Sequence, residues 1–231
     1  MSTICAISTA PGVGGIAVVR VSGPDAFKIC DRIFRPKKAG KSLSTQKAYP
    51  LTYGSIVGNN DETIDEVIAA VFRAPHSFTG EDTVEITCHG STYIQQQILQ
   101  SLISSGCRIA QPGDYTQRAF MTGTMDLSPA EAVADLIAST SAGQHRLALS
   151  QMRGGFSKEL AELRNQLLHF TSLMELELDF SDHEELEFAD RSELRTLADH
   201  IEQVISKLAQ SFSVGNAIKN GIPVAIIGET N

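Results

Sequence analysis

The sequence has few cysteines, and their spacing excludes two kinds of site. Only four occur in the 231 residues, Cys5, Cys30, Cys88 and Cys107, and no two of them form a C-x-x-C pair. This spacing predicts neither a zinc site nor a disulfide framework. Reduced thiols are then the default, which favours a cytoplasmic protein.

Long apolar runs and an excess of basic residues are absent as well. No stretch approaches the roughly 20 apolar residues that a membrane helix needs. The N-terminal MSTICAISTAPG has no charged segment followed by an apolar core, so we do not expect a signal peptide. The formal net charge of -8 excludes a basic surface over the whole chain, while a local basic patch stays open. We therefore expect a soluble globular protein without membrane contact.

Up to about residue 118, short β-rich segments alternate with turns and short helices. The apolar patterns predict strands over 15–22, 51–57, 64–72 and 83–88, and helices over 26–34 and 94–103. The two middle strands are expected to form a hairpin. Such a mixture is typical of an α+β domain, which we assign to residues 1–118.

From residue 119 to about 220 the pattern is helical, which predicts an all-α bundle segment. The sequence SPAE at 128–131 has a serine N-cap, proline at the first helical position and glutamate at the third. Apolar residues recur every three or four positions over 160–174 and 194–208, as in a helical bundle. The acidic segment 175–190 between them favours a solvated connector over a metal site around His183.

Residues 221–228, GIPVAIIG, predict a buried strand that ends in a glycine. The first four positions of a P-loop, G-x-x-x-x-G-K-[ST], match Gly228, Glu229, Thr230 and Asn231. We therefore assign 221–231 to the first strand and partial P-loop of a truncated nucleotide-binding domain. The chain is expected to be a fragment.

Two charged residues interrupt β-branched segments, Arg20 in IAVVRVS and Glu85 in TVEITC. One interpretation places both side chains on a solvent-facing side of a strand. In the other, the guanidinium binds an anionic ligand group and the carboxylate accepts hydrogen bonds from N–H groups of a heterocycle. Spacing does not decide between them.

Glycine-rich residues 11–15, PGVGG, are not a dinucleotide fingerprint. Ala17 stands where that motif needs glycine, and a strand rather than a helix follows. A tight turn is the plain interpretation, and close approach of a ligand to the backbone is the alternative. His89 and Gly90 follow a predicted strand, where binding groups are common.

Four stretches together resemble the N-terminal part of the MnmE family of tRNA modification GTPases, also called TrmE. They are APGVGGIAVVRVSG (10–23), SFTGEDTVEITCHG (77–90), PGDYTQRAFMTGTMDLSPAEAVADLI (112–137) and GIPVAIIGETN (221–231). They occur in the same order and at similar spacing, so the resemblance covers essentially the whole chain.

The resemblance implies a domain similar to the tetrahydrofolate-binding domains of aminomethyltransferases, which forms a homodimer, and then a helical domain with an inserted G domain. It implies a GTP-hydrolysing enzyme that works with the flavoprotein MnmG on tRNA. The reaction adds an aminomethyl or carboxymethylaminomethyl group to C5 of the wobble uridine. The carbon comes from 5,10-methylenetetrahydrofolate or 5-formyltetrahydrofolate, and K+ and Mg2+ act with GTP.

By the same resemblance, Arg20 and Glu85 contact the folate. Thr124 stands where the family has a lysine, so a hydroxyl replaces a positive charge there. Asn231 matches the P-loop asparagine that binds potassium. With the rest of the loop missing, we expect this chain to have no GTPase activity and no catalytic residue of its own. A non-catalytic folate-binding and dimerisation module stays an alternative, as does a free-standing aminomethyltransferase.

Overall fold

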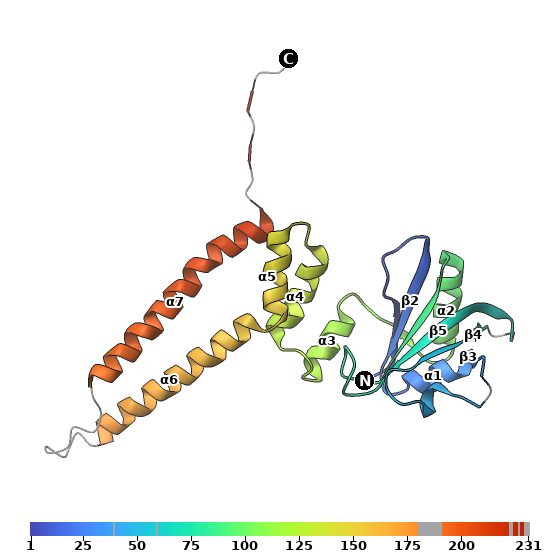
Figure 1. The fold of residues 1–231 in the computed structure, drawn as a ribbon, viewed down its shortest axis with the longest axis horizontal. Coiled ribbons are helices and arrows are strands. Elements are labelled where there is room, and N and C mark those ends of the chain that lie inside the picture. The colour runs from blue at the N-terminus through green and yellow to red at the C-terminus, as the bar shows by residue number, and fades with distance from the viewer. Residues whose placement is uncertain (39, 59, 180–190, 222–223, 226, 229–231) are drawn as a thin grey trace. The chain divides into compact units, whose positions relative to one another are not determined.

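A computed structural model describes residues 1–231 except 39, 59, 180–190, 222–223, 226 and 229–231. The chain divides into two compact units, Met1–Met125 and Asp126–Asn231 (Figure 1). The first unit extends beyond residue 118, where the sequence predicted its end. The reason is that α3 (Asp114–Met121) and the residue after it are bonded to the first unit through the side chains of Arg118 and Thr122.

The first unit is built on one seven-stranded sheet with the order β3-β4-β5-β6-β2-β1-β7. All neighbouring strands are antiparallel except β1 and β7. The strands are β1 (Ile4–Ile7), β2 (Gly14–Ser22), β3 (Phe34–Pro36), β4 (Leu51–Val57), β5 (Thr63–Phe72), β6 (Thr83–Gly90) and β7 (Arg108–Ile109). The four strands predicted from the sequence are confirmed. The shorter β1, β3 and β7 were missed because two to four residues are too few to show an alternating pattern.

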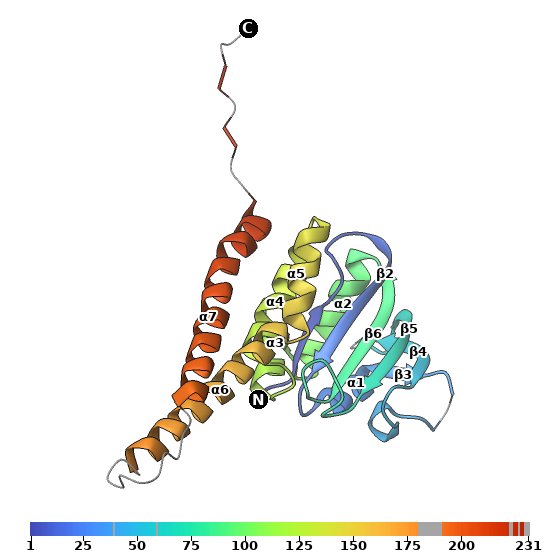
Figure 2. The ribbon, with the colours of Figure 1, turned by 60° about the vertical axis from the view of Figure 1, so that its left-hand side comes forward.

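One face of the sheet carries the hydrophobic core. Helices α1 (Ala26–Ile33) and α2 (Thr92–Ser104), both predicted, contribute buried side chains to the same cluster as alternate residues of β2, β5 and β6. For example, Val19 lies opposite Ile86, and both are fully buried. Figure 2 shows these strands and helices together.

The opposite face of the sheet is more exposed, and it carries the candidate site. Leu51 and Tyr53 on this face are 72% and 48% exposed. Directly opposed residues of antiparallel strands share a face. Leu51, Ala70, Glu85 and Arg20 therefore form one row across β4, β5, β6 and β2.

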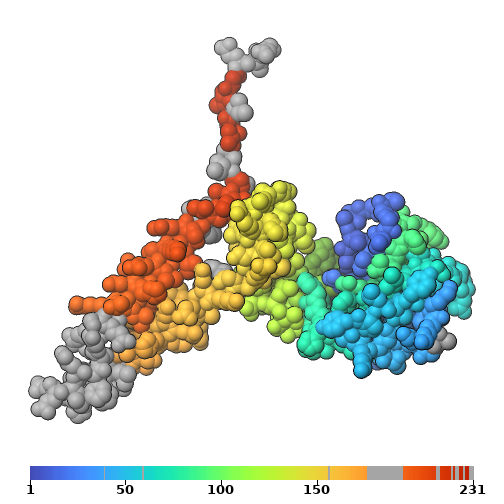
Figure 3. All heavy atoms as spheres, viewed as in Figure 1, coloured from blue at the N-terminus to red at the C-terminus, as the bar shows by residue number. Residues whose placement is uncertain are grey.

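The second unit is helical, as predicted. Its helices are α4 (Leu127–Ala138), α5 (Ala142–Met152), α6 (Gly155–Asp179) and α7 (Arg191–Asn220). The apolar stripes predicted on α6 and α7 are only partly buried, since Leu160 and Leu167 remain 44% and 43% exposed. A groove of about 640 Å³ opens between these two helices (Figure 3).

The start of α4 differs from the prediction. An N-cap at Ser128 is wrong, because the helix begins at Leu127 and its N-cap is Asp126. Pro129 is nevertheless buried within the first turn. It is tolerated there because the first N–H groups of a helix have no intrahelical acceptor.

The described residues of the strand predicted over 221–228, namely 221, 224, 225, 227 and 228, have no regular structure in this chain. A strand forms only where a neighbouring strand pairs with its backbone groups, so residue preference alone does not make one. The P-loop residues Glu229, Thr230 and Asn231 lie outside the described residues, as does most of the acidic segment. No helix in the described part of the chain has both the length and the apolar character needed to cross a membrane.

Candidate functional site

Arg20 and Glu85, the two charged strand residues noted in the sequence, form an ion pair with each other. They lie directly opposite one another on β2 and β6. Nε and Nη2 of Arg20 approach the same oxygen, Oε1 of Glu85, at 2.8 and 2.7 Å. The side chains are 24% and 26% exposed, so the pair is largely shielded yet reachable from solvent. The guanidinium therefore does bind a carboxylate, but the carboxylate belongs to the protein.

Two aromatic rings contact the guanidinium. Cζ of Arg20 lies 5.4 Å from the centre of the Phe78 ring and 5.5 Å from that of Tyr115, within the range of cation–π attraction. The Tyr115 hydroxyl donates a hydrogen bond of 2.7 Å to the backbone carbonyl of Arg20. Burial raises the pKa of Tyr115 above its ordinary value, which keeps this hydroxyl a donor at neutral pH. The position of Arg20 is therefore held from several sides.

The ion pair leaves one guanidinium nitrogen and one carboxylate oxygen without a partner. Among the described residues, Nη1 of Arg20 and Oε2 of Glu85 have no hydrogen-bond partner. Apolar Ala70 and Leu51 continue the same row of the sheet. A charged donor and acceptor beside apolar side chains can bind the polar edge of a flat heterocycle. The described part of the chain has no group of three or more His, Cys, Asp or Glu placed to share a metal ion.

A second ion pair, not identified from the sequence, fixes the loop before β6. Arg118 of α3 binds Oε2 of Glu81 at 2.7 Å through Nη1, and its Nη2 donates to the backbone carbonyl of Ser2 at 2.6 Å. The two side chains are only 7% and 14% exposed. Ser22 Oγ donates to the same Glu81 oxygen at 3.1 Å. The same loop carries Phe78, so the Arg118–Glu81 pair helps to hold the Phe78 ring against the Arg20 guanidinium. The two members of this pair lie 37 residues apart, and no local pattern links them.

Thr124, the third predicted folate residue, borders this loop and not the first ion pair. Its hydroxyl lies 3.0 Å from that of Thr122. A Cβ placed on Gly80 would clash with the Thr124 hydroxyl. In the described structure no hydrogen bond joins Thr124 to Arg20 or Glu85. Two of the three predicted residues are thus brought together.

The glycine-rich turn at 11–15 meets the end of β6. Gly14 lies opposite Gly90, and a Cβ on Gly90 would come within 2.7 Å of the Gly14 carbonyl carbon. This close approach is a backbone contact between the paired strands β2 and β6. His89 is oriented by Asp65, whose carboxylate lies 2.7 Å from Nδ1 and also accepts from the His89 backbone N–H at 2.8 Å.

All four cysteines are free and buried. Burial is the main cause that raises the pKa of the Cys88 thiol to about 11. It also raises the pKa of Cys30 above its ordinary value. The thiolate is the reactive form of cysteine, so these two thiols are poor nucleophiles and poor metal ligands near pH 7.

Comparison with known proteins agrees with the two-unit architecture. Residues 3–124 match the family model described as GTP-binding protein TrmE N-terminus, and residues 127–223 match the one described as MnmE helical domain. A protein of Parabacteroides distasonis named tRNA modification GTPase MnmE is 96% identical over 100% of this chain and 50% of its own length. Proteins of the same name from Bacteroides thetaiotaomicron and Porphyromonas gingivalis are 70% and 58% identical over 99% of this chain, and 49% and 48% of their own lengths. The chain thus spans about half the length of the curated relatives it matches.

Proposed function

Because the chain belongs to the MnmE family of tRNA modification GTPases, we propose that it is the folate-binding and dimerising part of a tRNA-modifying enzyme. In this proposal the whole protein works in the cytoplasm with the flavoprotein MnmG and hydrolyses GTP with Mg2+ and K+. It adds an aminomethyl or carboxymethylaminomethyl group to C5 of the wobble uridine of certain tRNAs. The observation that carries the role of this part is the accessible Arg20–Glu85 pair, with its unused donor and acceptor.

A reduced folate suits the chemistry of this pair. One edge of its pterin ring presents N–H donors next to a carbonyl acceptor, which are complementary to Oε2 of Glu85 and Nη1 of Arg20. The faces of the ring system are largely apolar and match Ala70 and Leu51 in the same row. Because 5,10-methylenetetrahydrofolate and 5-formyltetrahydrofolate share this edge, the pair accepts either. Thr124 supplies at most a neutral hydrogen bond from the border of the neighbouring loop.

We expect Arg20→Ala and Glu85→Ala each to weaken the binding of 5-formyltetrahydrofolate by about 1.5–3 kcal/mol, which is roughly 10- to 150-fold in affinity. Each change removes a charge-assisted hydrogen bond and leaves the other member of the pair without its partner. Isothermal titration calorimetry on the purified chain measures the effect. Arg108→Ala, which breaks the more exposed pair with Asp114, is the matched control and should leave the affinity unchanged. Unchanged affinity in both site variants would remove the folate assignment.

The exposed sheet face also supports the proposed homodimer. Leu51, Tyr53 and Ile68 are 72%, 48% and 42% exposed and lie on the neighbouring strands β4 and β5. Large apolar side chains gathered on one face are typical of an interaction surface. A second copy of the first unit would remove them from water. Since Leu51 shares its row with Glu85, the folate would then bind close to the dimer interface.

The alternative is a non-catalytic module that binds a folate and a second copy of itself. For this chain both functions predict GTP turnover no faster than a protein-free blank, because the lysine and hydroxyl residue of a P-loop do not follow Gly228 in its sequence. A phosphate-release assay checks this, and turnover above the blank would contradict the assignment of the nucleotide site. The whole protein separates the two functions. In an enzyme that uses the bound folate, Arg20→Ala should lower uridine modification at limiting folate by about 10- to 150-fold, and unchanged modification would favour the module.

A further inference from the structure

One segment of this acidic chain carries only positive charge. Between Arg32 and Asn60 the sequence has six lysines and arginines and no aspartate or glutamate, whereas the chain as a whole has a net charge of -8. The six, which we call the basic edge, are Arg32, Arg35, Lys37, Lys38, Lys41 and Lys47. All are exposed. Arg32 lies at the end of α1 and Arg35 in β3, which forms one of the two edges of the sheet. The four lysines lie between β3 and β4, on either side of the short 3-10 turn η1 (Leu43–Thr45).

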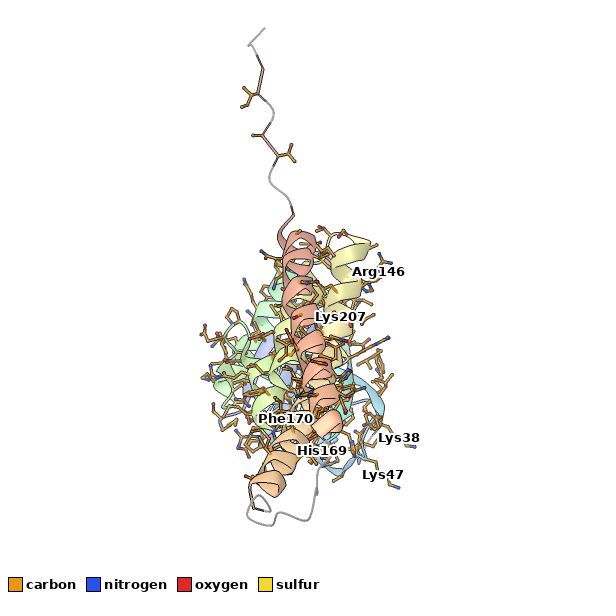
Figure 4. All side chains as sticks on the ribbon, turned by 90° about the vertical axis from the view of Figure 1, so that its left-hand side faces the viewer. Lys38, Lys47, Arg146, His169, Phe170 and Lys207 are labelled. Atoms are coloured by element: carbon orange, nitrogen blue, oxygen red, sulfur yellow. The ribbon has the colours of Figure 1, made fainter. Side chains whose placement is uncertain are left out.

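Four of these six charges have no acidic partner among the described residues, although Arg32 donates a hydrogen bond to the backbone carbonyl of Ser105. Lys37 lies 3.6 Å from Glu66, and Arg35 lies 4.0 Å from Asp61 at the very limit of an ion pair. Within the described residues, Lys38, Lys41 and Lys47 form no ion pair. Figure 4 shows Lys38 and Lys47 projecting outward from the ribbon. Their ammonium groups are free to bind anions.

The turn η1, between Lys41 and Lys47, is fixed to the body of the first unit. The Asp31 carboxylate accepts hydrogen bonds from the backbone N–H groups of Leu43 and Ser44 at 2.7 and 3.1 Å. Arg73 donates to the backbone carbonyls of Ser44 and Gln46 at 2.6 and 2.8 Å. A turn that is already ordered loses little backbone entropy when a partner binds. The basic edge is therefore a preformed cationic surface.

We infer that the basic edge binds the phosphate backbone of tRNA, an inference that rests on the tRNA substrate of the proposed function. Lysine ammonium groups bind phosphates as point charges and release counterions from the nucleic acid. A plainer role for such charges is to keep an edge strand from pairing with another sheet. That role concerns β3 (Phe34–Pro36), yet Lys41 and Lys47 lie beyond that strand, next to η1.

The test measures the binding of an unmodified tRNA transcript that has uridine at the wobble position. Fluorescence anisotropy detects the binding, at several salt concentrations. The variant Lys38→Ala/Lys41→Ala/Lys47→Ala should lose about tenfold to a hundredfold in affinity near 0.1 M salt. Its plot of log K against log salt should be shallower by about 2–3, because three phosphate contacts are lost. The matched control removes three exposed cations of the second unit, Arg146→Ala/Lys158→Ala/Lys207→Ala, two of which are labelled in Figure 4. It should change the affinity less than threefold.

An equal loss of tRNA affinity in both triple variants would mean that only the net charge of the chain matters. No loss of affinity in the lysine variant would mean that the basic edge serves only to keep the edge strand from pairing with another sheet. Either result overturns the inference, as does a wild-type chain that binds no tRNA. Binding of 5-formyltetrahydrofolate by the first triple variant should equal that of the wild type. Folate binding that depends on Arg20, combined with no tRNA binding, would leave the proposed folate role standing while this inference falls.

Discussion

Arg118→Ala is expected to destabilise the first unit by about 3–5 kcal/mol, the usual cost of breaking a buried ion pair from one side. The change leaves the Glu81 carboxylate, 14% exposed, without its guanidinium. It also removes the hydrogen bond from Arg118 to the backbone carbonyl of Ser2. Arg118→Lys should recover only part of the loss, because an ammonium group cannot reach both partners with the geometry of a guanidinium.

Urea unfolding, monitored by tyrosine fluorescence, measures this loss of stability. All four tyrosines lie in the first unit and the chain has no tryptophan, so the signal reports on that unit alone. Arg108→Ala is the control, since its pair with Asp114 has a similar length of 2.8 Å but a guanidinium that is 49% exposed. A loss of at most about 1 kcal/mol is expected there. If both arginine variants lose the same free energy of unfolding, burial does not make the Arg118 pair more stabilising than the exposed one.

Gly90→Ala is expected to cost about 3 kcal/mol, the upper end of the usual range for overpacking. The added Cβ would clash with the carbonyl oxygen of Gly14 and lie 2.7 Å from its carbonyl carbon. These are backbone atoms of the paired strand β2, and unlike the end of a flexible side chain they cannot turn aside. The same unfolding experiment measures the loss.

Gly15→Ala provides a control of identical chemistry in the same glycine-rich turn. A Cβ there meets no heavy atom within 4 Å, so the change should stay within about 0.5 kcal/mol of the wild type. If Gly90→Ala proves equally mild, β6 and the start of β2 do not pack this closely in solution, and the expectation is wrong.

Much of the fold follows from local patterns. Buried Ala17, Val19 and Val21 alternate with the less buried Val18 and Arg20 along β2, and a stripe of apolar residues marks α1, because side-chain periods of 2 and about 3.6 select residues for one buried face. The short β3 and β7 were not predicted, because they are strands through their pairing with the longer β4 and β1 and not through their own residues. For the same reason the apolar run at 221–228 has no strand in its described residues.

The candidate site divides in the same way. From its residues alone, the sequence determined that two charged side chains interrupt strands, that the thiols are unpaired and that the chain resembles one family. Only the tertiary structure decided that Arg20 meets Glu85, 65 residues away, and that Arg118 secures Glu81. The strand register and the packing of α3 result from burial of the core, which joins residues far apart in the sequence. A local sequence pattern therefore cannot predict which charged groups come within hydrogen-bond distance.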